Sequence, residues 1–243
     1  MIVITVGKTY IDIDGYASAI AYKQLLKQKG IESKFVSKAI LNYSITDSLK
    51  NLNYQIDDYE VKSDDKFIIL DLSNKDFFPD FVKEENIIEI IDHHPGFEDY
   101  WKEKLDNSII EPIGSVATII FEKYKKDNIN IDKNIAKLLM AAILDNTLNF
   151  NADITNKRDI EAYKKLEKIT SDYNYQDKYF SECQTYIENN LYNAIINDIK
   201  EQKINEIEVI GQLTIWDIDR LNIDKIRNIM KDNWIINIIS IKD

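Results

Sequence analysis

The sequence predicts an α/β fold, with a parallel sheet flanked by helices and a smaller α/β unit after it. Short apolar runs rich in β-formers alternate with amphipathic helical patterns through the first half, which is typical of βαβ units. After about residue 170 this alternation loosens, which indicates a second unit. The 243 residues, 44% hydrophobic and 30% charged, have the composition of an ordinary globular protein.

Each predicted element of the first half rests on its own pattern. Apolar runs predict strands at residues 2–6, 35–36, 67–70 and 87–91. Helical periodicity predicts helices at residues 17–29, 115–126, 133–144 and 159–169, and Gly30 is a plausible stop for the first of them. Together these elements predict a Rossmann-like parallel sheet within a first domain, residues 1–185.

The second half has weaker patterns. Residues 171–188 are polar and tyrosine-rich, which favours packing between two domains, and Asn189-Asn190 offers a hinge. A helix, a strand pair around residues 207–216, a helix at 224–230 and a final strand at 234–241 are expected to follow. We therefore predict a small C-terminal domain, residues 190–243.

Composition restricts the classes of partner and the compartment. A formal net charge of −11 repels a phosphate backbone, so we expect no binding of duplex nucleic acid. The apolar runs, such as residues 138–144, are too short to span a bilayer, and the N-terminus reads as a strand rather than a signal peptide. The single cysteine, Cys183, excludes an internal disulfide framework. These features predict a cytoplasmic protein.

The only two histidines of the chain stand together in the segment Asp92-His93-His94-Pro95. This segment follows the strand predicted at residues 87–91, and ligands of open α/β sheets collect at the carboxyl ends of strands. Imidazole nitrogens beside a carboxylate form a donor set for a divalent metal. The alternative is a chance histidine pair in a surface turn.

Four further aspartates lie at the ends of predicted elements: Asp12 and Asp14 in the loop after the first strand, Asp71 after a later strand, and Asp145 at the end of a helix. If the strands are parallel, these groups converge on one edge of the sheet. Carboxylates that alternate in direction can serve two ions while a third carboxylate bridges them, as a two-metal site requires. A cap or turn role is the alternative for any single aspartate.

These segments resemble the motifs of the DHH phosphoesterase superfamily. Order and spacing are most similar to the family II (manganese-dependent) inorganic pyrophosphatases and the related exopolyphosphatases, over roughly residues 1–165. The resembling segments are Asp12-Ile13-Asp14, Asp71, Asp92-His93-His94 and Leu144-Asp145-Asn146-Thr147, with support from residues 111–118 and the pair Thr155 and Asp159.

The resemblance implies a set of metal and substrate ligands. It implies one metal at Asp12 and Asp71 and another at Asp14, Asp71, His93 and Asp145, so that Asp71 bridges and His94 faces the substrate phosphate. Mn²⁺ is the first expectation for one or two bound ions, with Mg²⁺ or Co²⁺ as alternatives. Lys200 matches a phosphate-contacting lysine of the pyrophosphatase branch, in what resembles a short form of its C-terminal domain; an exposed helix-end lysine is the alternative.

The first motif departs from the family pattern, because Lys8 stands where the family has a metal-binding histidine. One expectation is that the Lys8 ammonium faces Asp12 and Asp71 and replaces an ion, in a catalytic role, so that one metal is held tightly. The others are weak metal binding through oxygens alone and a solvent-exposed strand-end lysine.

Three hypotheses of function follow. The first is a metal-dependent phosphohydrolase that acts on a small phosphoanhydride, pyrophosphate or short polyphosphate, with a metal-activated water as nucleophile. The second is a phosphodiesterase for oligonucleotides or cyclic dinucleotides, which the lack of histidine in the second half disfavours. The third is a catalytically weak relative that binds metal and a phosphorylated ligand. Whether the chain forms a homodimer stays open.

Overall fold

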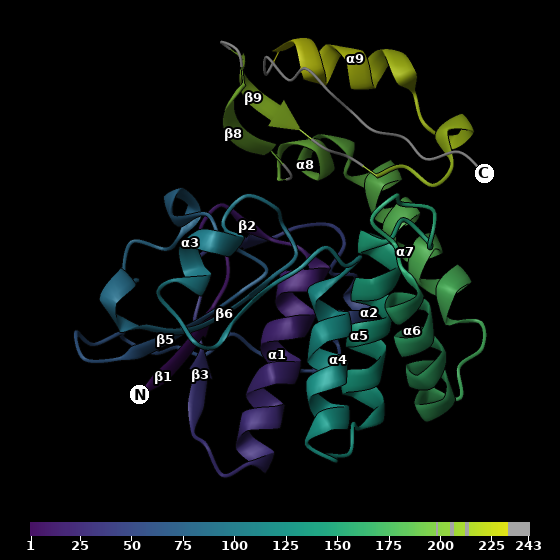
Figure 1. Ribbon diagram of the computed structural model, residues 1–243. Helices are drawn as coiled ribbons and strands as arrows, with labels where there is room; N and C mark the ends of the chain where they lie inside the picture. The colour runs from purple at the N-terminus through teal and green to yellow at the C-terminus, as the bar shows by residue number, and fades with distance from the viewer. Residues whose placement is uncertain (198, 205–206, 212–213, 233–243) are drawn as a thin grey trace.

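The main sheet of the protein has five strands, all parallel, in a computed structural model that describes residues 1–197, 199–204, 207–211 and 214–232 (Figure 1). The predicted α/β class is therefore confirmed. The strands, in sheet order, are β3 (Ser33–Phe35), β1 (Ile2–Thr5), β5 (Lys66–Leu70), β6 (Ile87–Asp92) and β7 (Ser108–Ile110). A separate parallel pair, β2 (Tyr10–Ile11) and β4 (Ile40–Leu41), lies beside it.

The direction in which successive strands are added to the sheet changes between β1 and β5, although all the strands stay parallel. From β1 the chain moves outward to β3, then returns to place β5 on the other side of β1. The loops after β1 and β5 therefore diverge, and this switch point is where open α/β sheets bind ligands. Asp12 and Asp71 are in these two loops.

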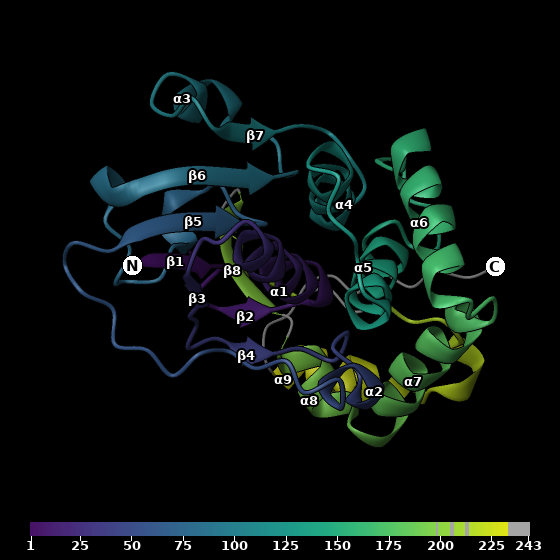
Figure 2. The ribbon, with the colours of Figure 1, turned by 90° about the horizontal axis from the view of Figure 1, so that it is seen from below.

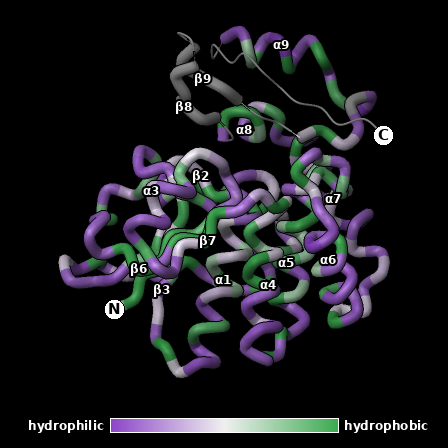
Figure 3. The backbone as a smooth tube through the Cα atoms, in the orientation of Figure 1, coloured by the Kyte–Doolittle hydropathy of each residue, from purple (hydrophilic) through white to green (hydrophobic). Residues whose placement is uncertain are grey.

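Helices cover one face of the sheet, and mainly short elements cover the other (Figure 2). On the first face lie α1 (Ile13–Gln28) and α4 (Val116–Lys126), with α5 (Lys133–Asn146) and α6 (Lys157–Thr170) packed outside them. The opposite face includes α3 (Glu98–Lys102) and the 3₁₀ turns Lys75–Phe77 and Glu84–Asn86. In Figure 3, α4 carries both hydrophobic and hydrophilic residues; Ile119, Ile120 and Phe121 are among its buried side chains.

Strand residues divide between two hydrophobic clusters because successive side chains point to opposite faces. Ile4 and Ile68 belong to the cluster under α1 and α4. Their neighbours Val3 and Phe67 belong to the cluster that contains Trp101 of α3. Complete burial of each such side chain contributes about 1.5–3 kcal/mol, so both faces stabilise the sheet.

Helix α1 begins earlier than the sequence pattern predicts. Asp12 is its N-cap and accepts a 2.9 Å hydrogen bond from the Gly15 N–H, so the helix starts at Ile13 instead of residue 17. Asp14 therefore lies in the first turn of a helix, and its predicted place in a loop is wrong. The predicted stop is correct, since Gly30 follows the helix with φ of 76°.

The second half contains more helix than predicted. The tyrosine-rich stretch forms α7 (Tyr175–Asn189), which is followed by α8 (Leu191–Ile196), the hairpin β8 (Ile199–Ile204) and β9 (Ile207–Gly211), the 3₁₀ turn Ile218–Arg220 and α9 (Ile223–Asp232). In Figure 1 this part lies above the ends of the main helices. The predicted strand pair exists but begins earlier, and the predicted final strand at residues 234–241 lies outside the described residues.

A small hydrophobic cluster forms the core of this second part. Its buried members are Tyr43, Ile187, Leu191, Ala194, Ile195, Ile215, Ile226 and Ile229. Cys183 and Ile187 both lie on α7, yet the first belongs to the main core and the second to this cluster. The domain boundary near residues 185–190 stays a prediction. Among the helices described, none is long and apolar enough to cross a membrane.

Candidate metal centre

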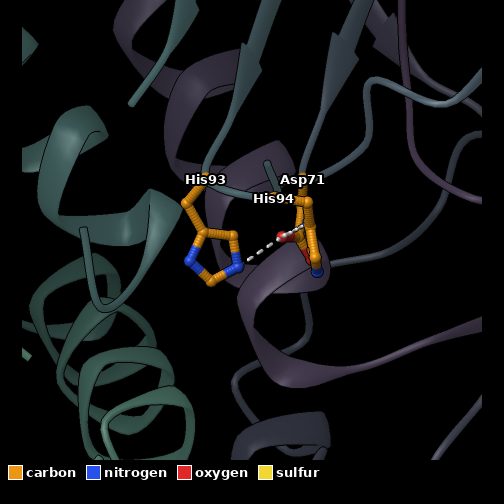
Figure 4. A group of neighbouring side chains, drawn as sticks. All are labelled: Asp71, His93 and His94. Atoms are coloured by element: carbon orange, nitrogen blue, oxygen red, sulfur yellow. Dashed lines mark ion pairs between the residues drawn. The ribbon is translucent and has the colours of Figure 1, made fainter. Parts of the chain in front are cut away.

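Asp71, His93 and His94 form a close group at the carboxyl edge of the sheet (Figure 4). Asp71 follows β5 and the two histidines follow the neighbouring strand β6, so the parallel pairing brings them together. One ligand atom from each lies within 4.8 Å of the others. His93 Nε2 is 3.4 Å from Asp71 Oδ1 and 4.0 Å from Asp14 Oδ2.

These distances fit a shared cation. Protein ligands lie about 2.0–2.6 Å from a bound divalent ion, so two atoms that share an ion are at most about 5 Å apart. Asp71 Oδ1 is buried and accepts no well-formed hydrogen bond from the described residues. A buried carboxylate oxygen of this kind needs a hydrogen-bond donor or a cation as its partner. The donor set therefore suits a divalent metal.

The His93 ring is oriented as a ligand. Its Nδ1 lies 2.9 Å from the carbonyl oxygen of Ile113, which can only accept a hydrogen bond. Nδ1 therefore carries the proton, and in the neutral ring the lone pair belongs to Nε2, on the side of Asp71 and Asp14. The side chain is only 8% exposed, so this orientation is fixed by packing as well.

The charges of the centre shift its pKa values strongly. Burial alone would lower the pKa of His93, but the carboxylates of Asp71 and Asp14 outweigh it and raise this pKa to about 10. Burial, together with the repulsion of Asp71, raises the pKa of Asp14 to about 8. Without a metal, protons therefore supply the positive charge that these buried carboxylates need.

Asp14 also has a structural role that the sequence did not predict. Its carboxylate is fully buried and caps the N-terminus of α4. Oδ1 accepts hydrogen bonds from the Ser115 hydroxyl at 2.8 Å and the Ala117 N–H at 2.9 Å, and Oδ2 accepts one from the Val116 N–H at 2.8 Å. Oδ2 is also the atom that faces His93.

Asp12 lies on the other side of Asp71, across Gly15. A Cβ at Gly15 would stand 3.4 Å from Asp71 Oδ2 and 3.6 Å from Asp12 Oδ1, so the two carboxylates flank one small space. Asp12, Asp71 and His94 line a cavity of about 340 Å³. Its other lining residues are Val6, Gly7, Thr9, Tyr10, Ile11, Gly15, Leu72, Ser73, Asn74, Phe77, Pro95 and Phe97, so no lysine or arginine of the described chain lines it.

Asp92 holds His94 toward this cavity. Asp92 Oδ1 lies 2.8 Å from His94 Nδ1 and also accepts the backbone N–H groups of His93 and His94. Burial would raise the pKa of Asp92, but the hydrogen bond from His94 outweighs it and lowers this pKa. The sequence indicates Asp92 as a carboxylate beside the histidines in a metal donor set; its role of orienting His94 is found only in the structure.

Asp145 lies in the last turn of α5, outside the close group of Asp71 and the two histidines. Its Oδ1 accepts a 2.9 Å hydrogen bond from the hydroxyl of Tyr179 on α7. Burial and the Asp145 charge raise the pKa of Tyr179 well above 10, so this hydroxyl keeps its proton. Sequence patterns do not indicate the Tyr179 contact, because 34 residues separate the partners.

Lys8 does not face Asp12 and Asp71, as the first of the three expectations for it required. Its Nζ lies 3.7 Å from Asp80, with the side chain 45% exposed, instead of between Asp12 and Asp71. The Lys8 N–H donates to the carbonyl of Phe77, which directs this segment toward the Phe77 loop. A surface ion pair of this kind contributes about 0–1 kcal/mol. The expected geometry is therefore wrong, while a catalytic role for Lys8 stays untested.

Lys200 lies in strand β8, opposite Ile210 of β9, so the alternative of a helix-end lysine is wrong. The position of its side chain is outside the part that the structure describes. Contact of Lys200 with substrate stays a prediction.

Comparison with known proteins identifies the family of this chain. Residues 2–143, which include the Asp92-His93-His94 segment, match the family model described as DHH family, N-terminal domain. The manganese-dependent inorganic pyrophosphatase of Bacillus subtilis is 29% identical over 168 residues, 65% of this chain and 52% of the relative. The chain thus spans about half the length of the curated relatives it matches.

Two solved structures share the fold. A Methanococcus jannaschii protein assigned to the family II inorganic pyrophosphatases aligns with a TM-score of 0.76 and 24% identity, over 100% of this chain and 83% of that one. An exopolyphosphatase-related protein from Bacteroides fragilis aligns with a TM-score of 0.62 and 16% identity, over 88% and 65%. The family match covers more than half of the sequence, and it agrees with the resemblance seen in the motifs: this chain belongs to the DHH family.

Proposed function

We propose that this protein is a metal-dependent phosphohydrolase that cleaves a small phosphoanhydride, pyrophosphate or short polyphosphate, with Mn²⁺ as its first-choice cation. The observation that carries the proposal is the close group of Asp71, His93 and His94 beside the cavity. The name of the Bacillus subtilis relative supports both the substrate class and the metal.

Asp71 can bridge two cations because its oxygens face different partners. Oδ1 faces His93, and Oδ2 lies on the Gly15 side, toward Asp12. One ion would use Asp71 and His93, with Asp14 and Asp145 as further ligands, and a second would use Asp12 and Asp71. Bound divalent cations act as Lewis acids that lower the pKa of water and neutralise phosphoryl oxygens.

His94 supplies positive charge on the cavity side. Burial would lower its pKa, but the hydrogen bond to Asp92 and the charge of Asp71 outweigh it and raise this pKa. With Nδ1 held by Asp92, the side chain lines the cavity and can donate to a phosphate oxygen through Nε2. Lys200 on β8 would add a second substrate contact, and Asp71 and His94 form the core of the proposed catalytic set, with Lys8 as its untested third member.

The test is a substrate and metal panel on the whole protein. We expect phosphate release from pyrophosphate or tripolyphosphate when Mn²⁺ is added to metal-stripped protein, with Mg²⁺ and Co²⁺ compared in parallel. ATP, a linear dinucleotide and a cyclic dinucleotide complete the panel. Cleavage of a dinucleotide without cleavage of pyrophosphate would favour a phosphodiesterase, and metal binding without any turnover would favour a catalytically weak relative.

Metal binding should release protons, and affinity should rise with pH. The metal-free protein keeps His93 protonated below its pKa of about 10, and an ion can take Nε2 only after that proton leaves. Asp14, the other buried ligand of this ion, has a pKa raised to about 8, so at pH 7 we expect between one and two protons released per ion and binding that tightens at least tenfold per pH unit. Calorimetry in buffers of different ionisation enthalpy measures this release; pH-independent affinity between pH 6 and 8 would contradict it.

Three further features of the proposal concern setting and partners. We propose that the protein works in the cytoplasm on a small phosphorylated substrate and does not bind duplex nucleic acid. Its acidic balance, with a net charge of −11, supports the last point. Homodimer formation stays open, and light scattering would decide it.

A further inference from the structure

The hydroxyl of Tyr179 on α7 contacts two segments that are far apart in the sequence: the end of α5, at Asp145, and the segment around Ser44. The Tyr179 side chain is 2% exposed, and its hydroxyl lies 2.9 Å from Asp145 Oδ1 and 3.0 Å from the carbonyl oxygen of Ser44. Both partners are acceptors, and the hydroxyl has one proton. Its orientation is therefore fixed by two groups that are 34 and 135 residues away in the sequence.

Ser44 continues this contact to the first metal motif. Its Oγ accepts a 2.8 Å hydrogen bond from the N–H of Ile13, the residue between Asp12 and Asp14. The same Oγ donates to Asn42 Oδ1 at 2.6 Å, and the Ser44 N–H donates to that oxygen at 3.0 Å. Ser44 is thus held rigidly, and it holds the first turn of α1.

The same segment reaches the small cluster of the second part. Tyr43 packs in that cluster, and its hydroxyl accepts a 2.9 Å hydrogen bond from the N–H of Thr214. Helix α7 contributes to both cores, through Cys183 to the main one and Ile187 to the small one. Tyr179 therefore lies where the second part of the chain meets the metal motifs.

We propose that Tyr179 is a positioning residue of the metal centre, which fixes the Asp145 carboxylate directly and the first turn of α1 through Ser44. The inference rests on the proposed function in one respect, that Asp145 is a metal ligand. Carboxylate ligands are generally held by outer hydrogen bonds, and loss of such a partner costs about 10–100-fold in metal affinity or activity.

The chain provides a matched control in Tyr175, one helical turn earlier on α7. Its ring stacks on that of Tyr179 at 6.4 Å, it is also buried, and its hydroxyl donates to the carbonyl of Lys137 on α5 at 3.1 Å. Tyr175→Phe and Tyr179→Phe each remove one hydroxyl that bridges α7 and α5. Only the second removes a contact to a proposed metal ligand.

The experiment measures Mn²⁺ affinity and stoichiometry by calorimetry on the whole protein, with thermal melts of each variant without metal. We expect Tyr179→Phe to weaken Mn²⁺ binding about tenfold and Tyr175→Phe to leave it within about twofold. The two variants should lose similar thermal stability, since each loses one buried hydrogen bond. Equal affinity losses in both, or none in Tyr179→Phe, would overturn the inference.

Asp145→Asn separates this inference from the proposed function. In that background Tyr179→Phe should weaken binding less than it does in the unmodified protein, because only the contact to Ser44 remains and effects that share one contact are not additive. If the unmodified protein binds Mn²⁺ and hydrolyses pyrophosphate while Asp145→Asn binds it equally well, the role of Tyr179 is refuted and the proposed function stands. If the unmodified protein binds no divalent metal, both fail.

Discussion

Asp71→Asn is expected to lower pyrophosphate hydrolysis about 1000-fold, or about 4 kcal/mol of transition-state stabilisation, and to weaken Mn²⁺ binding strongly. The substitution keeps the shape of the side chain but removes the charge that Oδ1 directs at His93 Nε2, 3.4 Å away. It also removes the bridge toward Asp12. Asp71 has a φ of 57°, and asparagine tolerates this left-handed conformation, so the backbone should not change.

The matched control is Asp80→Asn, because Asp80 is 98% exposed and pairs only weakly with Lys8. Steady-state kinetics, calorimetry with Mn²⁺ and circular dichroism on both variants test the prediction. Asp80→Asn should retain full activity and metal affinity. A folded Asp71→Asn protein with activity within tenfold of the unmodified protein would show that Asp71 does not bridge the reactive centre.

The residues of this centre differ in how far the sequence could predict them. Asp71 and His93 directly follow apolar runs, so strand prediction and parallel pairing were enough to place them together. The sequence pattern places Asp145 at the end of a helix, but it does not show how far that helix end lies from the sheet. The pattern could not reveal that Asp12 caps α1, because capping and metal binding favour the same residue type.

Contacts between distant segments account for what the sequence could not show. Lys8 differs from its expected place because the chain after β1 runs toward Phe77 and Asp80, and nothing local to Lys8 encodes that loop. Tyr179 belongs to a polar stretch for which the sequence pattern predicts no helix. In the structure this stretch is α7, and Tyr175 and Tyr179 on its buried face pack in the main core. Such pairings depend on tertiary packing, which overrides local propensity.

The second prediction concerns the loop whose Ile113 carbonyl orients His93. At Gly114 in this loop there is no room for a Cβ atom. A Cβ at Gly114 would lie 2.5 Å from Thr147 Cγ2 and 2.7 Å from Asp159 Oδ2. Asp159 is fully buried and cannot retreat, because it accepts hydrogen bonds from the Gly114 and Asn156 N–H groups and the Thr118 hydroxyl.

Thr147 is held equally firmly. Its hydroxyl donates to the carbonyl of Ile143 and accepts the N–H of Phe150, the last of three residues with positive φ that follow α5. Left-handed residues other than glycine persist only where their surroundings fix them. A methyl group at position 114 must therefore displace the loop itself, including the Ile113 carbonyl that holds His93 Nδ1.

Gly114→Ala is accordingly expected to destabilise the fold by about 1–3 kcal/mol, the usual cost of overpacking a rigid site. It should also weaken Mn²⁺ binding about tenfold, because His93 loses the partner that orients it. Gly30→Ala is the control: with φ of 76° and no atom within 4 Å of its Cβ, it should cost about 1 kcal/mol and leave metal affinity unchanged. Denaturant melts and calorimetry separate the two effects. Equal metal affinity in both variants would mean that His93 keeps its orientation without the Ile113 carbonyl, and that the loop serves stability alone.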